Sequence, residues 1–302
     1  MNTELRWPPL VLSEWQDTYD TLHMWTQMVG KVCLAYTPKQ NHYWNIAFHL
    51  TPIGLTTPTL NLGERSLAMT FDFVDHLLRF EVSDGREVTL PLEPQTVAEF
   101  YSRFQDRLHR LDISPKIWPM PVEFEHPIPF KQDTTHRSYD RAHVEAYWQA
   151  CLSMQPVFEE FRCGFLGKCS PLHFFWGGFD LALTRFSGRR APDRPDADEV
   201  QRESYSHEVI SHGFWPGGGF IPEAAFYAYS SPEPAGFSSA KVKPKAAFYD
   251  AKGFKEFILP YEAVRTSPTP EADLRAFFDT TYSAAADLAG WNRADLERAV
   301  PA

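Results

Sequence analysis

The chain presents the same order of secondary-structure signals twice, and this duplication constrains its fold more than any other feature. In the first half, two strand-like runs turn at Asp84 and Gly85, and the segment LPLE (90–93) follows. In the second half, two such runs turn at Gly253, and the segment LPYE (259–262) follows. Glycine accepts the positive φ that tight hairpin turns require, so both turns predict antiparallel strand pairs. The sequence therefore predicts two pseudo-repeated halves.

Each half also combines helical and strand-like patterns in the same order. Predicted helices cover residues 17–36, 96–111, 140–161 and 270–291, and strand-forming segments cover residues 41–50, 67–82, 86–92, 172–186, 223–230 and 246–262. The helix at 96–111 carries its apolar residues on one stripe, as a helix packed on a sheet does. HYWNIAFHL (42–50) aligns with HFFWGGFDL (173–181), which supports duplication. We predict an α+β fold in which each half is an antiparallel sheet with flanking helices.

The halves meet at a proline-rich segment. Four prolines in IWPMPVEFEHPIPF (117–130) exclude a helix there and predict an extended connector. We therefore divide the chain into an N-terminal half, residues 1–126, and a C-terminal half, residues 127–302. The C-terminal half carries a polar insertion, SGRRAPDRPDADEVQRES (187–204), which the N-terminal half lacks. Long loops on a compact scaffold frequently carry function, so we expect the site in the C-terminal half.

Composition limits the classes of partner. Aromatic residues make up 15% of the chain, which favours a ring-rich core or an aromatic-lined pocket for a small molecule. The formal net charge of −10 repels phosphate backbones and anionic membranes, so we expect neither nucleic acid nor a membrane as partner. No run of about 18 apolar residues is present to span a bilayer. The sequence makes no prediction of the oligomeric state.

The cysteines indicate a reducing compartment. Four cysteines in a chain of 302 residues do not form a disulfide framework, and the first residues lack the features of a signal peptide. We therefore expect a cytoplasmic protein with reduced thiols. Cys163, Cys169 and His173 are spaced by six and four residues, which differs from the Cys-x-x-Cys pattern of structural zinc sites. Ordinary buried thiols are the favoured interpretation.

The segment SYSHEVISHGFWPGGG (204–219) is the best candidate for a site. Glu208 and His212 are four residues apart, so their side chains share a face on a helix and also on a strand. On a helix they are neighbours, whereas on a strand they lie about 13–14 Å apart. A carboxylate beside an imidazole raises its basicity, which yields a general base or a supported metal ligand. The alternative is a surface ion pair, or a histidine bonded to the backbone.

Residues around this pair favour the functional interpretation. Phe214 and Trp215 place rings beside His212, and the following glycines allow close approach of a ligand. His207 lies five residues from His212 and therefore leaves a strand by the opposite face. A metal site that used both histidines would need a bend between them.

The strand predicted at 172–186 supplies the second part of the candidate site. Alternation places Asp180 on one face with Trp176, glycine and threonine, as the wall of a cavity would be. The other face is mainly apolar and includes Arg185. Arg185, Arg189 and Arg190 are candidates to bind a carboxylate or a phosphate, because a guanidinium offers its N–H donors as a planar fork. The competing interpretations are a solvent-facing Asp180 and a solvated cluster of charges.

Three segments carry a resemblance to a known family. They are HFFWGGFDLALTRFSGRRAP (173–192), SHEVISHGFWPGGG (206–219) and AAFYAYSSPEPAG (224–236). In these segments the chain resembles a bacterial family of uncharacterised proteins, catalogued only as a domain of unknown function. The resemblance covers nearly the whole chain and implies no activity, cofactor or catalytic residue.

The leading interpretation is a cytoplasmic enzyme that uses acid/base chemistry on a small, partly apolar molecule in an aromatic-lined pocket. The predicted catalytic residues are Glu208, His212 and Asp180, and the predicted ligand-binding residues are Trp176, Phe214, Trp215, Arg185 and His207. A metal-assisted version with His212 as ligand stays open. The sequence identifies neither a metal nor a cofactor, because it contains no phosphate-binding loop, nucleophile elbow, zinc-protease motif or dinucleotide-binding motif. The alternatives are a non-catalytic small-molecule-binding protein and a structural or interaction protein.

Overall fold

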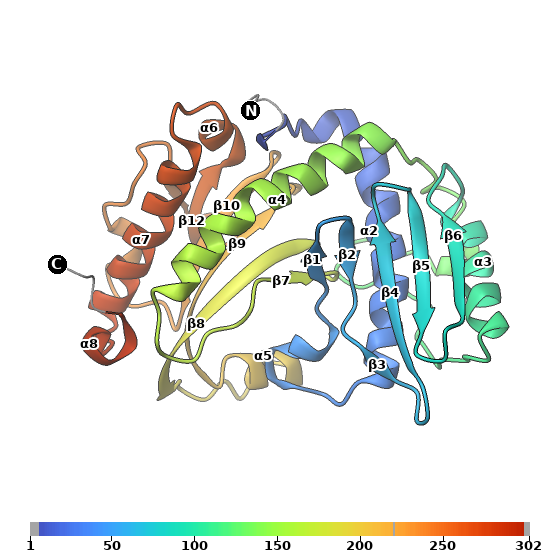
Figure 1. Cartoon of the computed structure of the whole chain (residues 1–302). Helices are drawn as coiled ribbons and strands as arrows, with labels where there is room; N and C mark the ends of the chain where they lie inside the picture. Colours follow the sequence, from blue (N-terminus) through green and yellow to red (C-terminus); the bar gives the residue numbers. More distant parts are fainter. Residues whose placement is uncertain (1–5, 220, 299–302) are drawn as a thin grey trace. The chain divides into compact units, whose positions relative to one another are not determined.

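The structure is a computed structural model that describes residues 6–219 and 221–298. Its chain forms two compact units, which are interleaved along the sequence. The C-terminal unit comprises Met1–Leu12, Ser153–His173 and Asp180–Ala302, and the N-terminal unit comprises Ser13–Leu152 and Phe174–Phe179. Figure 1 labels the elements of both units.

The N-terminal unit combines a long helix with an antiparallel sheet. Its elements in chain order are α2 (Leu12–Tyr36), η1 (Asn41–Ile46), β1 (His49–Thr51), β2 (Gly54–Thr56), β3 (Leu60–Asn61), β4 (Ser66–Asp72), β5 (Leu77–Val82), β6 (Glu87–Pro91), α3 (Val97–Arg110) and η2 (Phe130–Gln132). The strands are arranged in the order β1-β2-β4-β5-β6, and β3 pairs with β4 outside that path. The predicted hairpin is confirmed between β5 and β6, where Gly85 has a φ of 88°.

Helix α3 shows how local sequence directs this unit. Thr96 and Glu99 form a reciprocal capping box at its start, which satisfies backbone N–H groups that have no partner inside the helix. The predicted apolar stripe is buried, and Phe100 stacks on Trp25 of α2 with ring centroids 4.3 Å apart. The stripe and the cap together fix where α3 begins and which side it buries.

The C-terminal unit repeats the combination of sheet and helices. Its elements are the last part of α4 (Arg141–Cys163), β7 (His173–Phe175), β8 (Asp180–Arg190), α5 (Glu199–Ser204), β9 (His207–Trp215), β10 (Ala225–Ser231), η3 (Phe237–Ser239), β11 (Phe248–Asp250), β12 (Glu256–Pro260), α6 (Tyr261–Arg265), α7 (Pro270–Leu288) and α8 (Arg293–Leu296). The strands run in the order β11-β12-β10-β9-β8-β7. Figure 1 shows α7 and the end of α4 beside β9 and β10.

Strand register assigns the side chains of this sheet to two faces. On β9, His212 pairs with Leu183 of β8, whereas Gly213 pairs with Ala182 of β8 and Tyr227 of β10. We call the side that packs on α4 and α7 the helix face; it carries Leu181, Leu183, Arg185, Glu208, Ile210, His212, Phe214 and Phe226. We call the other side the tyrosine face; it carries Asp180, Ala182, Thr184, Ser211, Gly213, Trp215, Tyr227, Tyr229 and Glu256.

Two predicted strands are shorter than the sequence suggested. The segment 41–50 begins as a 3₁₀ turn, with His42 and Tyr43 at positive φ, and becomes a strand only at His49. The segment 172–186 breaks between β7 and β8, where Phe179 has a φ of 56°. An aromatic-rich run of alternating residues predicts a strand even when one of its residues adopts the left-handed region of φ and ψ. The alternation therefore could not reveal either break.

The α+β class is confirmed. Within the described residues, the helices accompany two antiparallel sheets of six strands each, an arrangement consistent with two pseudo-repeated halves. The division predicted at residues 126 and 127 stays a prediction. The two compact units change over at residues 12/13, 152/153, 173/174 and 179/180.

Candidate functional site

His212 lies inside the core of the C-terminal unit. Its side chain is fully buried on the helix face, between the rings of Phe161 (centroids 4.7 Å apart) and Phe278 (5.3 Å). Its Nε2 lies 3.0 Å from Oγ1 of Thr281, and that hydroxyl donates to the carbonyl of Phe277. The hydroxyl proton is therefore already used, so Nε2–H donates to Thr281 and the proton-free nitrogen is Nδ1.

The surroundings of His212 hold it in the neutral form. Burial lowers the pKa of His212 well below its ordinary value, and the nearby charge of Arg185 lowers it further. Among the described residues, Nδ1 has no hydrogen-bond partner. An imidazole packed between two phenylalanine rings has no route to a substrate proton, so this geometry is that of a packing residue.

Glu208 is engaged at the edge of the same face. Its carboxylate accepts two hydrogen bonds from Arg189, at 3.0 and 2.7 Å. The same guanidinium donates to the carbonyls of Ala289 and Gly290, just beyond the C-terminus of α7. Arg189 therefore ties β9 to a helix end, where a cation is favoured by the helix dipole. Glu208 acts here as the counter-ion of that arginine.

Asp180 belongs to the tyrosine face. Its carboxylate accepts a hydrogen bond of 2.6 Å from the hydroxyl of Tyr227, two strands away. The side chain of Tyr227 reaches β8 by crossing Gly213, where an added Cβ would meet the ring at 2.1 Å. The glycine in the predicted motif thus makes room for a tyrosine of the neighbouring strand, as glycine in a strand interior frequently does.

The expectation that Asp180, Glu208 and His212 open into one hollow is wrong. The register that pairs Leu183 with His212 places the imidazole on the helix face and the Asp180 carboxylate on the other face. A side chain in a strand alternates sides with every residue, and the register between strands decides which residues meet. Their individual catalytic roles stay predictions, but the structure does not bring these three groups together.

The tyrosine face borders an open hollow, which we call the Tyr205 pocket. It has a volume of about 620 Å³ and is lined by Arg194, Gln201, Tyr205, Tyr229, Ser230, Ser231, Glu233, Phe254, Lys255 and Glu256. Tyr229 stacks on Tyr227, and its hydroxyl lies 3.2 Å from that of Tyr205 at the end of α5. Burial raises the pKa of both Tyr227 and Tyr229 well above the ordinary value, so both phenols keep their protons.

Glu256 is the unusual acid of this pocket. Burial raises its pKa to about 8, and the charges of Asp180 and Asp250 act in the same direction. No group in the described part of the chain donates a hydrogen bond to its carboxyl, whereas the Asp180 carboxylate accepts one from Tyr227. Two neighbouring carboxyl groups with different environments can divide the roles of acid and anion.

Arg194 supplies a cation at the same pocket. Its guanidinium lies 4.8 Å from the ring centroid of Tyr205 and donates to the hydroxyl of Ser231 at 2.7 Å. Trp215, one of the predicted ligand-binding residues, packs edge-on against Phe254 of the pocket wall. Rings, hydroxyls, a cation and a carboxyl group with a raised pKa therefore surround the Tyr205 pocket.

The other predicted ligand-binding residues serve packing or lie at the surface. Phe214 is buried on the helix face against Phe226 and Tyr261. Arg185 is buried among aromatic rings, with its guanidinium carbon 3.4 Å from the centroid of Phe161. His207 is exposed, and its Nδ1 lies 3.2 Å from the hydroxyl of Ser206. Phe214, Arg185 and His207 are not among the residues that line the Tyr205 pocket.

Trp176 belongs to the N-terminal unit. Its indole packs on Gly30 of α2, where an added Cβ would lie 2.1 Å from the ring, and its Nε1 donates to the carbonyl of Ile46. In the same unit the buried imidazole of His76 lies 3.0 Å from the exposed carboxylate of Glu145. The other ring nitrogen of His76 is bonded to Tyr139, so both nitrogens are occupied by the protein itself.

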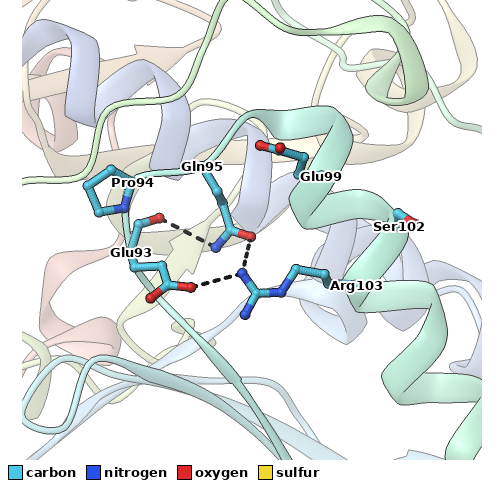
Figure 2. Close-up of a pocket in the computed structure, with 6 residues that line it drawn as sticks. All are labelled: Glu93, Pro94, Gln95, Glu99, Ser102 and Arg103. Carbon is cyan, nitrogen blue, oxygen red and sulfur yellow. Dashed lines mark hydrogen bonds and ion pairs between the residues drawn. The ribbon is translucent and has the colours of Figure 1, made fainter.

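The N-terminal unit also has a surface hollow at the start of α3. Figure 2 shows its lining residues, in which Arg103 donates to Glu93 at 2.9 Å and to Gln95 at 2.7 Å. Glu99 is used by the capping box of the helix. Because its charged groups satisfy one another, this hollow offers less to a ligand than the Tyr205 pocket does.

No metal-binding cluster is found in the part of the chain that the structure describes. Within residues 6–219 and 221–298, no three histidine, cysteine, aspartate or glutamate side chains converge as metal ligands. Cys163 is exposed, Cys169 is partly buried, and burial raises the pKa of the Cys169 thiol to about 11. A thiol with such a pKa stays protonated and is a poor metal ligand.

Sequence reasoning missed Tyr205, Tyr229 and Glu256. Tyr227 and Tyr229 alternate along β10 and therefore share a face, but no local sequence signal indicates that this face meets α5 and β12. The polar insertion at 187–204 contributes Arg194 and Gln201 to the lining of the Tyr205 pocket, and Tyr205 directly follows it. The expectation that this part of the chain carries function stays a prediction.

The chain is similar to a known protein family. No described helix is both long enough and apolar enough to cross a membrane. Neither the curated proteins nor the solved structures contain a match to the chain. Residues 7–298, nearly the full length, match the family described as "Family of unknown function (DUF5996)". The chain therefore belongs to this family, DUF5996.

Proposed function

We propose that the protein binds a small, partly apolar molecule in the Tyr205 pocket and transfers a proton to it from Glu256. The observation that carries the proposal is the position of the Glu256 carboxyl in the wall of a hollow lined by Tyr205, Tyr229 and Phe254. An ordinary glutamate is ionised at neutral pH, whereas Glu256, with a pKa of about 8, holds its proton and releases it near the working pH.

The neighbouring groups support an acid role. The tyrosine hydroxyls of Tyr205 and Tyr229 lie 3.2 Å apart and offer a donor and an acceptor to a polar group of the ligand. Phe254 supplies an apolar wall, and Arg194 a positive charge. Glu256 would give its proton to an oxygen or nitrogen of the ligand, and the carboxylate left behind would take one from water.

Binding without catalysis is the second candidate. The lining residues include no histidine or cysteine, and Glu233, the other acid, accepts a hydrogen bond from the hydroxyl of Tyr249. The pocket thus holds one unengaged acid and no nucleophile–base pair of the kind that covalent catalysis uses. This is the observation behind the second candidate, a binding protein in which Glu256 donates a hydrogen bond rather than a proton.

The test compares binding with turnover. For binding, the wild type, Tyr205→Ala and Glu256→Gln are each titrated with phenyl phosphate, benzoate and benzamide at millimolar concentration. For turnover, the same proteins are assayed across pH for hydrolysis of phenyl phosphate, phenyl acetate and a phenyl glycoside. We expect at least one compound to bind and Tyr205→Ala to weaken it. Loss of turnover with retained affinity in Glu256→Gln supports the enzyme, and binding without turnover supports the binding protein. Equal signals from wild type and Tyr205→Ala contradict the pocket.

A further inference from the structure

A second hollow adjoins the Tyr205 pocket. It has a volume of about 310 Å³ and is lined by Arg190, Ala191, Pro192, Asp193, Arg194, Pro195, Arg202, Tyr205 and Ser206. We call it the arginine hollow. Arg194 and Tyr205 line both hollows, so a ligand seated on the ring of Tyr205 has the arginine hollow directly beside it.

The charge balance of the arginine hollow is positive. Asp193 is its one acid and pairs with Arg190 at 3.1 Å, both side chains being largely exposed. Arg194 is held by a hydroxyl and a ring, and neither removes its charge. Arg202, on α5, has no acidic partner within the described residues. Two uncompensated guanidinium groups therefore remain in a protein whose net charge is −10.

Such a pair of guanidinium groups selects its ligand by charge and shape. A guanidinium offers its N–H donors in a planar fork that matches two oxygens of a phosphate or carboxylate. A phosphate monoester carries nearly two negative charges at neutral pH, and two arginines neutralise it. A carboxylate carries one charge and leaves one guanidinium uncompensated.

We infer that the molecule bound by this protein is a phosphate monoester of a partly apolar compound. Its phosphate is held by Arg194 and Arg202 in the arginine hollow, and its apolar body lies against Tyr205 and Phe254 in the neighbouring pocket. This inference rests on the proposed function and adds to it the chemical class of the ligand. It also assigns Arg194 the role of joining the two hollows.

The decisive experiment is a calorimetric titration of the full chain with phenyl phosphate, benzoate and benzyl alcohol. We expect phenyl phosphate to bind most tightly, and its affinity to fall with added salt as ion pairs do. Arg194→Gln and Arg202→Gln should each weaken phenyl phosphate roughly 10- to 100-fold, the range that a hydrogen bond to a charged group is worth. Arg265→Gln, which removes a half-buried arginine paired with Glu262 on α6, is the control and should bind as the wild type does.

The outcomes separate the ligand class from the proposed function. If benzoate or benzyl alcohol binds as tightly as phenyl phosphate, or both arginine variants keep wild-type affinity, the inference is wrong, while the Tyr205 pocket can still bind another molecule. If phenyl phosphate binds through both arginines but Glu256→Gln changes neither turnover nor its pH profile, the ligand class stands and the acid role of Glu256 falls. Circular dichroism of each variant checks that loss of binding is not loss of fold.

Discussion

At the scale of single residues, the structure places His212 in the core of the C-terminal unit and Glu256 in the wall of the Tyr205 pocket. His212 stood out in the sequence because a glutamate, two rings and three glycines surround it. Its position between Phe161 and Phe278 shows that the imidazole itself belongs to a core. Glu256 had no such signal, yet burial raises the pKa of its carboxyl to about 8.

Replacing His212 by alanine tests its packing role. The change opens a cavity between two phenylalanine rings and leaves Thr281 without its donor, so we expect a loss of about 2–4 kcal/mol in the free energy of unfolding. His207→Ala, at an exposed position, should change it by less than about 0.5 kcal/mol. Urea denaturation measures both. A His212→Ala protein of unchanged stability that no longer binds phenyl phosphate would overturn this assignment.

Replacing Gly213 by alanine tests the crossing of Tyr227 over β9. The new methyl group would lie 2.1 Å from the Tyr227 ring and 2.3 Å from the carbonyl of Leu181, which is backbone. We expect a destabilisation of roughly 2–3 kcal/mol, as for overpacked cores. Gly164→Ala is the matched control, because its nearest contact would be at 3.6 Å. Similar unfolding midpoints for the two variants would show that the tyrosine does not lie where we place it.

The charge state of Glu256 predicts how stability depends on pH. Its pKa is raised from 4.5 to about 8, so the folded protein keeps a proton that the unfolded chain has released between these values. Unfolding then releases a proton, and stability falls as pH rises through this window. Glu256→Gln removes the titrating carboxyl and should therefore remove this part of the decline in the free energy of unfolding. We expect this part to be about 2 kcal/mol between pH 5 and 8, a value limited by the partial burial of the carboxyl. Parallel curves for both proteins would contradict it.

At the scale of elements, helix α2 carries a buried cation. Lys31 is 5% exposed, its amine lies 5.2 and 5.8 Å from the ring centroids of Trp118 and Trp176, and burial lowers its pKa to about 8. Lysine at this position therefore costs stability while it is charged. The cost disappears as pH rises from 8 to the unfolded value of 10.5, since only the unfolded chain is protonated there.

Lys31→Met tests this element. Methionine keeps the length of the side chain and removes the charge, so we expect a gain of about 1–2 kcal/mol at pH 7 that vanishes near pH 10.5. Lys131→Met, at an exposed site of the same unit, should show no such dependence. Thermal unfolding at several pH values provides the measurement. A loss of stability at pH 7 would mean that attraction between the amine and the two indoles outweighs the cost of burial.

Elements also show where sequence reasoning reaches its limit. The helices at 96–111 and 270–291 and the hairpin at Gly85 were predictable, because caps, apolar stripes and glycine turns are local signals. The break at Phe179 was not, since a residue at positive φ leaves no mark in an alternating run. The pairing of Leu183 with His212 was not either, because register depends on which strands meet.

At the scale of the whole molecule, the predicted α+β class and the family are confirmed, and the ligand remains our proposal. The Tyr205 pocket draws on α5, β10 and β12, which lie far apart in the sequence. Sequence motifs could not predict this pocket, because no short segment of the sequence contains its lining residues. The cytoplasmic location and the absence of nucleic-acid and membrane partners stay predictions from composition.

The central claim is that the chemistry of this protein lies on the tyrosine face, with Glu256 as its acid. Titrating the Glu256 side-chain carboxyl by ¹³C nuclear magnetic resonance, with Glu256→Gln to assign the signal, tests that claim most directly. We predict a pKa near 8, moving downward when Asp180 is replaced by asparagine, because burial and the Asp180 charge both raise it. A pKa near 4.5 that is insensitive to Asp180 would contradict the account.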